Sequence, residues 1–450
     1  MHSHILKSVR VILARMDQTV LYIIALTMAV TFPLTAVAQN ILSLAEAQQL
    51  AVDRSRQLAG QDLAVAANRD MAVSAAQNPD PVLSVGIDNL PLDGADQYSL
   101  TNDSMTQRRI GLSQEFTRGD KKRLRGERYD REVEKILAEK ASLTLVIQRD
   151  TALAWLDRYY AEAGAALISE QIRQSQNEIE AAQTAYRAGR GNLSDVLAAR
   201  TALVGLRDRD SETVRKLRMA KIALVREIGE PGELPLEQRP PIDNIPIDID
   251  SLEKHVAMHP EIVILSKQEN LALTEAHLAQ ANRQADWSVE VSYAQRGSQY
   301  SNMASIGISF PLQWDHTSRQ DREVTAKFAL AEQAREQREE VTRVAIAEVR
   351  GMVAEWESAR ERQARLEHEL VPLAAERTQS ELSAYRSGKS SLNNVLEARR
   401  NEVDARLQAL QMEAEAARLW AQLNFHFLND HTSVISHQDT VRAAPEKDTK

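Results

Sequence analysis

The stretch AYRAGRGNLSDVLAAR at residues 185–200 returns later in the chain as AYRSGKSSLNNVLEAR at residues 384–399. Nine of the sixteen positions are identical, and the offset is 199 residues throughout. Gly189 and Gly388 stand at the same place in the two copies and can adopt the positive φ that ends a helix. We interpret each copy as the turn of a helical hairpin, and the chain as a tandem duplication.

Helical periodicity extends away from both turns. From about Asp120 to Arg187 apolar residues recur at three- and four-residue steps without a proline, which is typical of coiled-coil packing. At about 1.5 Å per residue such a helix would be roughly 100 Å long. A second helix is expected over about 192–228, and the same pair is expected again over about 317–387 and 391–428. Each half is therefore predicted to contain a long antiparallel helical hairpin.

Four short segments alternate between apolar and small or polar residues, which predicts strands at about 81–88, 107–116, 287–293 and 304–312. The alternation places Glu115 and Glu290 on the face opposite to the apolar one. The residues predicted for the apolar face are Leu83, Val85, Ile110, Leu112, Trp287, Val289, Ile306, Ile308 and Phe310.

This pattern is typical of an outer-membrane barrel wall, with the apolar face toward lipid and the two glutamates toward the lumen. A soluble sheet packed on the helices is the alternative. Four strands are too few for a barrel, because the smallest spanning barrels use about eight. A chain with lipid-facing strands would have to oligomerise to remove its sheet edges, so that two copies supply eight strands and three supply twelve.

Composition and motifs exclude several classes of function. The net charge of −9 does not suggest a nucleic-acid partner. The absence of cysteine excludes disulfides, thiolate metal sites, a cysteine nucleophile and a lipid-modified N-terminal cysteine. No catalytic or nucleotide-binding motif is present, so we predict a protein that is not an enzyme and holds no cofactor. His255 and His259 have helical ligand spacing, but Pro260 disfavours helix there, and no metal site is predicted.

The N-terminal segment resembles a secretory signal. Lys7, Arg10 and Arg15 precede an apolar run that ends in Ala36-Val37-Ala38, and this pattern predicts a signal peptide over residues 1–38 with cleavage after Ala38. An uncleaved membrane anchor is the alternative.

The remaining chain is divided by its composition. We predict a first repeat over 39–230, a proline-rich linker over 231–250 and a second repeat over 251–428. The polar residues 429–450 show no periodicity and are predicted to be a disordered tail.

The chain resembles the TolC-type outer-membrane factors of tripartite efflux and secretion systems. The resemblance covers about 41–428 and is carried by the order and spacing of several motifs. These are LSLAEAQQLAV at the start, QEFTRGDKKRLR after the second strand, ISFPL in the fourth strand and the doubled AYRxG motif. NPDPVLSVGIDNLP and QEFTRGDKKRLRGE are most similar to the CzcC-like branch, which serves heavy-metal-exporting RND pumps.

The resemblance implies a mainly α fold with a small β part. In a homotrimer it would form a 12-stranded outer-membrane β-barrel and a periplasmic α-helical barrel. It also implies an exit duct in the outer membrane of a Gram-negative bacterium that exports heavy-metal cations. The partners would be a periplasmic adaptor, an inner-membrane RND pump and outer-membrane lipid. A multidrug or type I secretion channel is the first alternative, and a soluble periplasmic coiled-coil scaffold is the second.

In such proteins the hairpin turns form the periplasmic gate and the docking surface for the adaptor. An amide stands at position 394, where the family often has an acid. For Tyr186, Tyr385, Gly189 and Gly388 the alternative is a purely structural role in forming the turns. Carried over by position, the residues of this tip are Tyr186, Gly189, Asp195, Tyr385, Gly388, Asn394 and Glu397.

Overall fold

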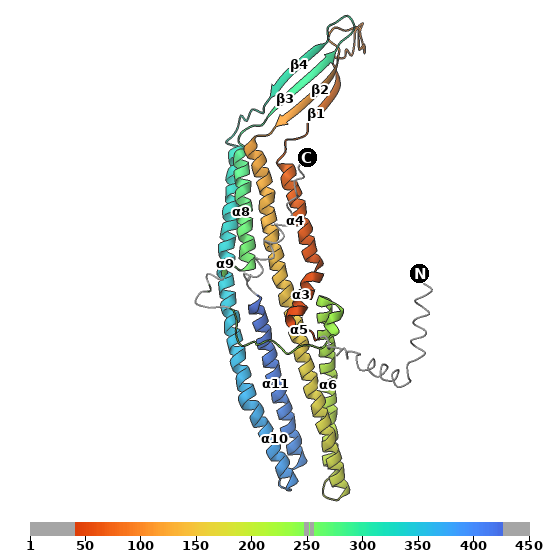
Figure 1. Cartoon of the computed structure of the whole chain (residues 1–450), viewed down its shortest axis with the longest axis vertical. Coiled ribbons are helices and arrows are strands. Elements are labelled where there is room, and N and C mark those ends of the chain that lie inside the picture. Colours follow the sequence, from red (N-terminus) through yellow and green to blue (C-terminus); the bar gives the residue numbers. More distant parts are fainter. Residues whose placement is uncertain (1–40, 247–251, 253–255, 426–450) are drawn as a thin grey trace, which may run out of the picture.

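The computed structural model describes residues 41–246, 252 and 256–425. The signal peptide expected over 1–38 and the tail expected over 429–450 lie outside these residues. The described part is elongated, with a small sheet at one end, long helices through the middle and two hairpin turns at the other end (Figure 1).

The first hairpin is built by α5 (Gly119–Arg187) and α6 (Leu193–Ile228). At 69 residues α5 contains no proline to interrupt it, and its apolar residues recur at helical spacing as expected. Two shorter helices precede it: α3 (Leu44–Arg54) and α4 (Arg56–Ala75). Both begin at a serine whose hydroxyl accepts a backbone N–H three residues further on, which satisfies one of the free donors at the start of each helix.

The second hairpin differs from the uninterrupted 317–387 helix that the periodicity predicts. Helix α9 (Gln320–Arg365) is followed by a π-helical turn, η3 (Leu366–Leu370), and then by α10 (Val371–Arg386). Pro372 at the start of α10 is the physical reason, because it has no N–H and its ring collides with the carbonyl one turn earlier. The hairpin returns through α11 (Leu392–Asn424). Ahead of α9 lies α8 (Pro260–Ala281), which packs along it.

The sheet is antiparallel in the order β1-β2-β3-β4. Its strands are β1 (Val82–Asp88), β2 (Gln107–Phe116), β3 (Trp287–Gln295) and β4 (Met303–Ser309). Since β4 ends at Ser309, Phe310 lies beyond the strand in which the sequence pattern placed it. The following Pro311 has no N–H to donate to a ladder.

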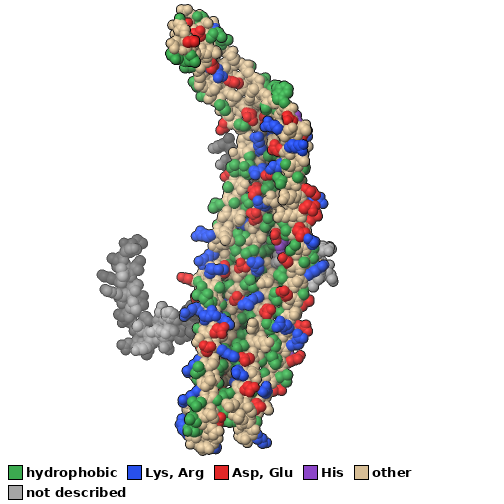
Figure 2. Space-filling model, turned by 180° about the vertical axis from the view of Figure 1, so that it is seen from behind, with side chains coloured by type: hydrophobic (Ala, Val, Ile, Leu, Met, Phe, Trp, Pro, Cys, Tyr) green, Lys and Arg blue, Asp and Glu red, His purple; other side chains and the backbone are tan. Residues whose placement is uncertain are grey.

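The main hydrophobic core lies in the middle of the helical part. Trp155 and Leu156 of α5 are fully buried there with Leu224 of α6, Val349 of α9 and Ala417 of α11. This cluster joins both hairpins, so they form one packed body around it. Charged side chains of both signs are interspersed over the outside of the helices (Figure 2).

The segment predicted as a proline-rich linker packs on this core. After the 3-10 turn η1 (Glu230–Glu233), Leu236 forms a parallel bridge with Leu42. The indole Nε1 of Trp420 donates to the carbonyl of Asn244 at 2.9 Å, and the Arg158 guanidinium donates to the carbonyl of Gly232. The described part of the segment therefore contacts both hairpins and holds them together. Residues 247–250 lie outside the described residues.

Candidate functional site

The sheet has two chemically different faces. Register pairs Leu83 with Leu112 and Val85 with Ile110, and the same face continues across β3 and β4. Val85 is 76% exposed, Ile306 78% and Ile308 67%. Apart from Phe310, the residues predicted for the apolar face share this one side. The sheet thus presents a broad exposed apolar surface that nothing in the described chain covers.

The opposite face is polar and carries Glu115 and Glu290. Arg109 of β2 lies between two strands on this face, with its Nε 2.9 Å from Oδ2 of Asp88 and its Nη1 2.9 Å from Oε1 of Glu290. A Cβ at Gly111 would lie only 2.7 Å from the hydroxyl of Ser84, so the face is also closely packed beside this cluster. One arginine therefore offsets two carboxylates on the polar face, near the end of the sheet that lies away from the helices.

Sequence reasoning missed Arg109 and Asp88. The signal was available in the alternation itself, because Arg109 and Glu115 are an even number of residues apart in β2 and so share a face.

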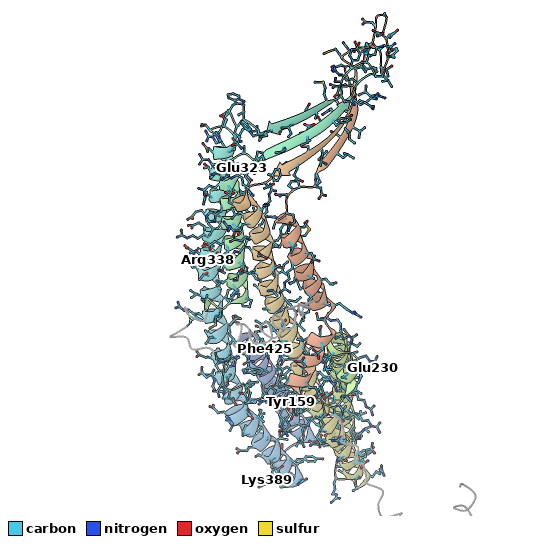
Figure 3. The ribbon with its side chains drawn as sticks, turned by 45° about the horizontal axis from the view of Figure 1, so that its top comes forward. Tyr159, Glu230, Glu323, Arg338, Lys389 and Phe425 are labelled. Atoms are coloured by element: carbon cyan, nitrogen blue, oxygen red, sulfur yellow. The ribbon has the colours of Figure 1, made fainter. Side chains whose placement is uncertain are left out.

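The two hairpin turns are closed by the same hydrogen bonds. Gly189 has φ 67° and Gly388 has φ 77°. The N–H of each glycine donates to the carbonyl of the tyrosine three residues before it, Tyr186 or Tyr385, at 3.0 and 2.9 Å. The next residue donates to the carbonyl five residues before it, which completes a Schellman motif in each turn. The second turn is marked by Lys389 (Figure 3).

Two of the predicted tip residues, Asp195 and Asn394, make hydrogen bonds at the start of the next helix. The carboxylate of Asp195 accepts the backbone N–H of Asn192 at 3.3 Å. At the equivalent position Asn394 donates its backbone N–H to the hydroxyl of Ser391 at 3.4 Å. Its side-chain amide donates to Ser390 at 3.1 Å. Asp195 therefore has a capping role, whereas the cap at the second turn is Ser391, which accepts the backbone N–H of Asn394.

The other predicted tip residues divide between a small core and the surface. Tyr385 packs against a cluster in which Val196 and Ala199 of the first hairpin meet Leu392 and Val395 of the second. Tyr186 is outside this cluster and is 47% exposed. Glu397 is exposed on α11 and lines a groove of about 600 Å³ between α6 and α11.

Three ion pairs hold α11 against the first hairpin. Arg399 lies 3.2 Å from Glu178 of α5, and Arg209 of α6 lies 2.6 Å from Asp404. The third pair, further from the tip, joins Arg418 of α11 and Asp157 of α5 at 2.6 Å.

Arg399 ends the repeated sequence motif, yet its counterpart Arg200 is exposed and has no ion pair within the described residues. The repeated sequence therefore gives the two arginines equivalent positions, but it does not give them equivalent ion pairs. No signal in the sequence distinguished the two arginines, because the partner of Arg399 lies 221 residues away.

Burial raises the pKa of the Glu178 carboxyl, and the Arg399 guanidinium opposes that rise. Its side chain is only 15% exposed.

The described residues contain no group of three or more His, Asp or Glu side chains placed to hold a metal ion. None of the described helices combines the length and the apolar character needed to cross a membrane.

The fold is similar to solved outer-membrane channels. The CmeC outer membrane channel of Campylobacter jejuni matches with a TM-score of 0.72 at 14% identity, over 88% of this chain and 89% of that chain. CusC, in a structure that concerns transmembrane channel formation, matches with a TM-score of 0.72 at 16% identity, over 85% and 92%. The outer membrane protein VceC of Vibrio cholerae matches with a TM-score of 0.68 at 15% identity, over 85% and 96%.

Sequence comparisons add nothing to this. No protein-family model matches the chain, and no match was found among curated proteins. The structural similarity shows that the chain has the fold of these channels, in which long helical hairpins extend from a four-stranded antiparallel sheet.

Proposed function

We propose that this chain is one third of an outer-membrane exit duct of a tripartite efflux system. The observation that carries the proposal is the sheet, which exposes one apolar face and has an unpaired edge on both β1 and β4 within the described residues. An apolar face needs lipid or protein to cover it. Unpaired strand edges are unstable in a membrane, and closing the strands into a barrel pairs these edges with one another. Three copies would close twelve strands, in agreement with the TolC-type resemblance, and the repeated hairpins would be a tandem duplication.

The helical hairpins would then extend the barrel into the periplasm. The turns at their tips would be the gate and the docking surface for the adaptor, which connects the duct to an inner-membrane RND pump. The ion pair Arg399–Glu178 supports a gate here, because it joins the two hairpins close to the turns, and Arg209–Asp404 joins them further along the helices. Opening would require these contacts to separate, and the pump would supply the energy.

Heavy-metal cations are the cargo that we propose. The polar face carries Asp88, Glu115 and Glu290 against Arg109, and a surplus of acids along a pore concentrates cations. Lipophilic drugs or a secreted protein are the alternative cargoes, since most of the lining is small and neutral.

A growth-inhibition panel tests the cargo. It compares the wild-type strain with an in-frame deletion and with the complemented deletion, on copper, silver, zinc, cobalt and cadmium salts, several lipophilic drugs and detergents. Sensitivity confined to metals supports the proposal and identifies the ions. Sensitivity to drugs with unchanged metal tolerance would replace it with multidrug efflux.

Conductance tests the channel itself. The purified protein is expected to need detergent and to form discrete conductance steps in a planar bilayer. A water-soluble protein without conductance would instead favour a periplasmic scaffold.

A further inference from the structure

Two consecutive arginines of β2 lie on opposite faces of the sheet. Arg109 is on the polar face and is paired with two acids, as described above. Arg108 is on the apolar face, where its Cα lies opposite Ile87 of β1 and Gln295 of β3. Within the described residues its guanidinium has no hydrogen bond or ion pair, and its Nε is buried. The two terminal nitrogens of the guanidinium are not among the buried unpaired atoms, so a cation with free donors lies on an apolar face without an acid of the described chain beside it, and this points to an anionic partner outside the chain.

The position of Arg108 along the strand indicates where that partner lies. At the helical end of the same face, the rings of Phe116 and Trp287 stack with their centroids 4.7 Å apart. Arg108 is eight residues from Phe116 in β2, which corresponds to roughly 27 Å along the strand. With the usual tilt of barrel strands this becomes roughly 20 Å along the membrane normal, close to the height of the apolar band of such barrels, about 25 Å. Arg108 would therefore lie at the level of the outer headgroups if the aromatic pair lies at the inner ones.

The neighbouring polar side chains fit this assignment. Gln114, also on the apolar face of β2, donates its amide to the carbonyl of Pro79 at 2.8 Å, so it needs no outside partner. On the same face, opposite Ile110, Tyr293 accepts a hydrogen bond from the Asn302 amide at 2.7 Å. A tyrosine that combines an apolar ring with a bonded hydroxyl is typical of a membrane interface.

We propose that Arg108 binds a phosphate group of a lipid in the outer leaflet. The inference rests on the proposed function, because it requires the apolar face to be in the membrane. The planar guanidinium fits a phosphate with two parallel hydrogen bonds, and its aliphatic stem can lie along the apolar face while the charge reaches the headgroups. Free phosphate has the same chemistry, but the apolar surroundings of Arg108 favour a phosphate that is attached to an acyl-bearing molecule.

Native mass spectrometry of the full-length protein from outer membranes tests the site. The probes are lipid A with its phosphates, lipid A from which they have been removed, and inorganic phosphate as a competitor. We expect Arg108→Gln to weaken binding of phosphorylated lipid A roughly tenfold, because hydrogen bonds to a charged group are lost. Arg108→Lys should give an intermediate loss, because it keeps the charge but not the two parallel hydrogen bonds. Arg109→Gln is the matched control: it removes the same charge one residue away on the opposite face and should bind this lipid like the wild type.

Each other outcome would overturn the inference. It fails if Arg108→Gln binds phosphorylated lipid A like the wild type, or if the dephosphorylated lipid binds as tightly. It also fails if only inorganic phosphate depends on Arg108, since the site would then be a soluble-anion site. Conductance of the same preparations separates the two proposals. If Arg108→Gln both conducts and binds lipid like the wild type, the lipid site is refuted and the channel is not. If the wild type itself never conducts, the channel is refuted.

Discussion

Arg209 of α6 and Asp404 of α11 form an ion pair between the two hairpins, with 2.6 Å between Nη1 and Oδ1. Their side chains are 38% and 48% exposed. Ion pairs with this much access to solvent contribute about 0–1 kcal/mol, because water and salt screen them. Beyond the main core, contact between the lower parts of the hairpins therefore depends on several weak pairs and on the small core at the tips, and no single surface contact is decisive.

Arg209→Ala should open the proposed gate only slightly. Loss of at most about 1 kcal/mol corresponds to a change of at most about fivefold in the ratio of open to closed channels. Single-channel recording in planar bilayers measures that ratio. The exchanged pair, Arg209→Asp with Asp404→Arg, should restore most of the closed state. An exchanged variant that opens more than Arg209→Ala would show that the two residues do not act through each other.

Arg399→Ala should have a larger effect than Arg209→Ala. Its partner Glu178 is only 15% exposed, so the substitution leaves a largely buried carboxylate without its cation. The loss is expected to be about 1–3 kcal/mol, since a buried polar group without its partner keeps its full desolvation cost. Single-channel recording again gives the change. Arg200→Ala removes the equivalent arginine of the first repeat, which has no ion pair within the described residues, and should resemble the wild type. Equal effects of both substitutions would refute this account.

The closed contact should depend on pH through Glu178. Burial raises the pKa of this carboxyl when the hairpins are packed together, although Arg399 opposes the rise. Separated hairpins would expose the carboxyl and return its pKa to the ordinary range. The packed form then binds the proton more tightly, so its stability is greatest at acidic pH and falls as the pH rises through the raised pKa.

The measurement is the open probability of the channel as the pH is raised from the ordinary pKa of a glutamate, about 4.3, to near neutrality. We expect the wild type to open less at the acidic end. Glu178→Gln cannot ionise and should lose this dependence. A wild-type channel that opens on acidification would have the opposite sign and would exclude Glu178 as the responsible group.

The sequence predicted the elements much better than it predicted the contacts between them. Periodicity alone indicated a helix from about Asp120 to Arg187, and α5 occupies almost that range, because its stripe of apolar residues reflects local geometry. Periodicity did not indicate the π-helical turn before Pro372, because apolar residues recur at helical spacing on both sides of this turn. One proline outweighed the pattern because it removes a hydrogen bond that the pattern does not record.

The candidate site was predictable only in part, for a related reason. Alternation along a strand assigns both Glu290 and Arg109 to the polar face, but it does not show that they meet, because their contact depends on register between two strands that are far apart in sequence. The roles of Asp195 and Asn394 were also incompletely predicted. Their hydrogen bonds start a helix, and spacing alone could not distinguish that role from the lining of a constriction.

Gly388→Ala should destabilise the second turn through its backbone alone. Gly388 has φ 77°, and a Cβ there would have no heavy atom within 4 Å, so the cost is left-handed strain of about 1–2 kcal/mol. Gly205 of α6 is a matched control. A Cβ there also has open space, but the residue is inside a helix, and Gly205→Ala should stabilise by about 0.5–1 kcal/mol. Thermal unfolding followed by circular dichroism should shift in opposite directions for the two variants; shifts in the same direction would refute the assignment of strain to the turn.

Arg109→Gln should make the proposed channel more selective for cations. Arg109 is 2.9 Å from both Asp88 and Glu290, so its removal leaves two carboxylates of the polar face without their cation. In a trimer the lining would lose three positive charges, and the attraction of the pore for cations would increase. Reversal potentials across a salt gradient measure the change, and they should be recorded below about 0.1 M salt, where charges act over about 10 Å or more. Glu290→Gln should shift selectivity in the opposite direction, and Arg108→Gln, which removes a charge from the other face, should leave it unchanged. If Arg108→Gln rather than Arg109→Gln shifted the reversal potential, the apolar face and not the polar one would line the pore, and the barrel proposed above would be inside out.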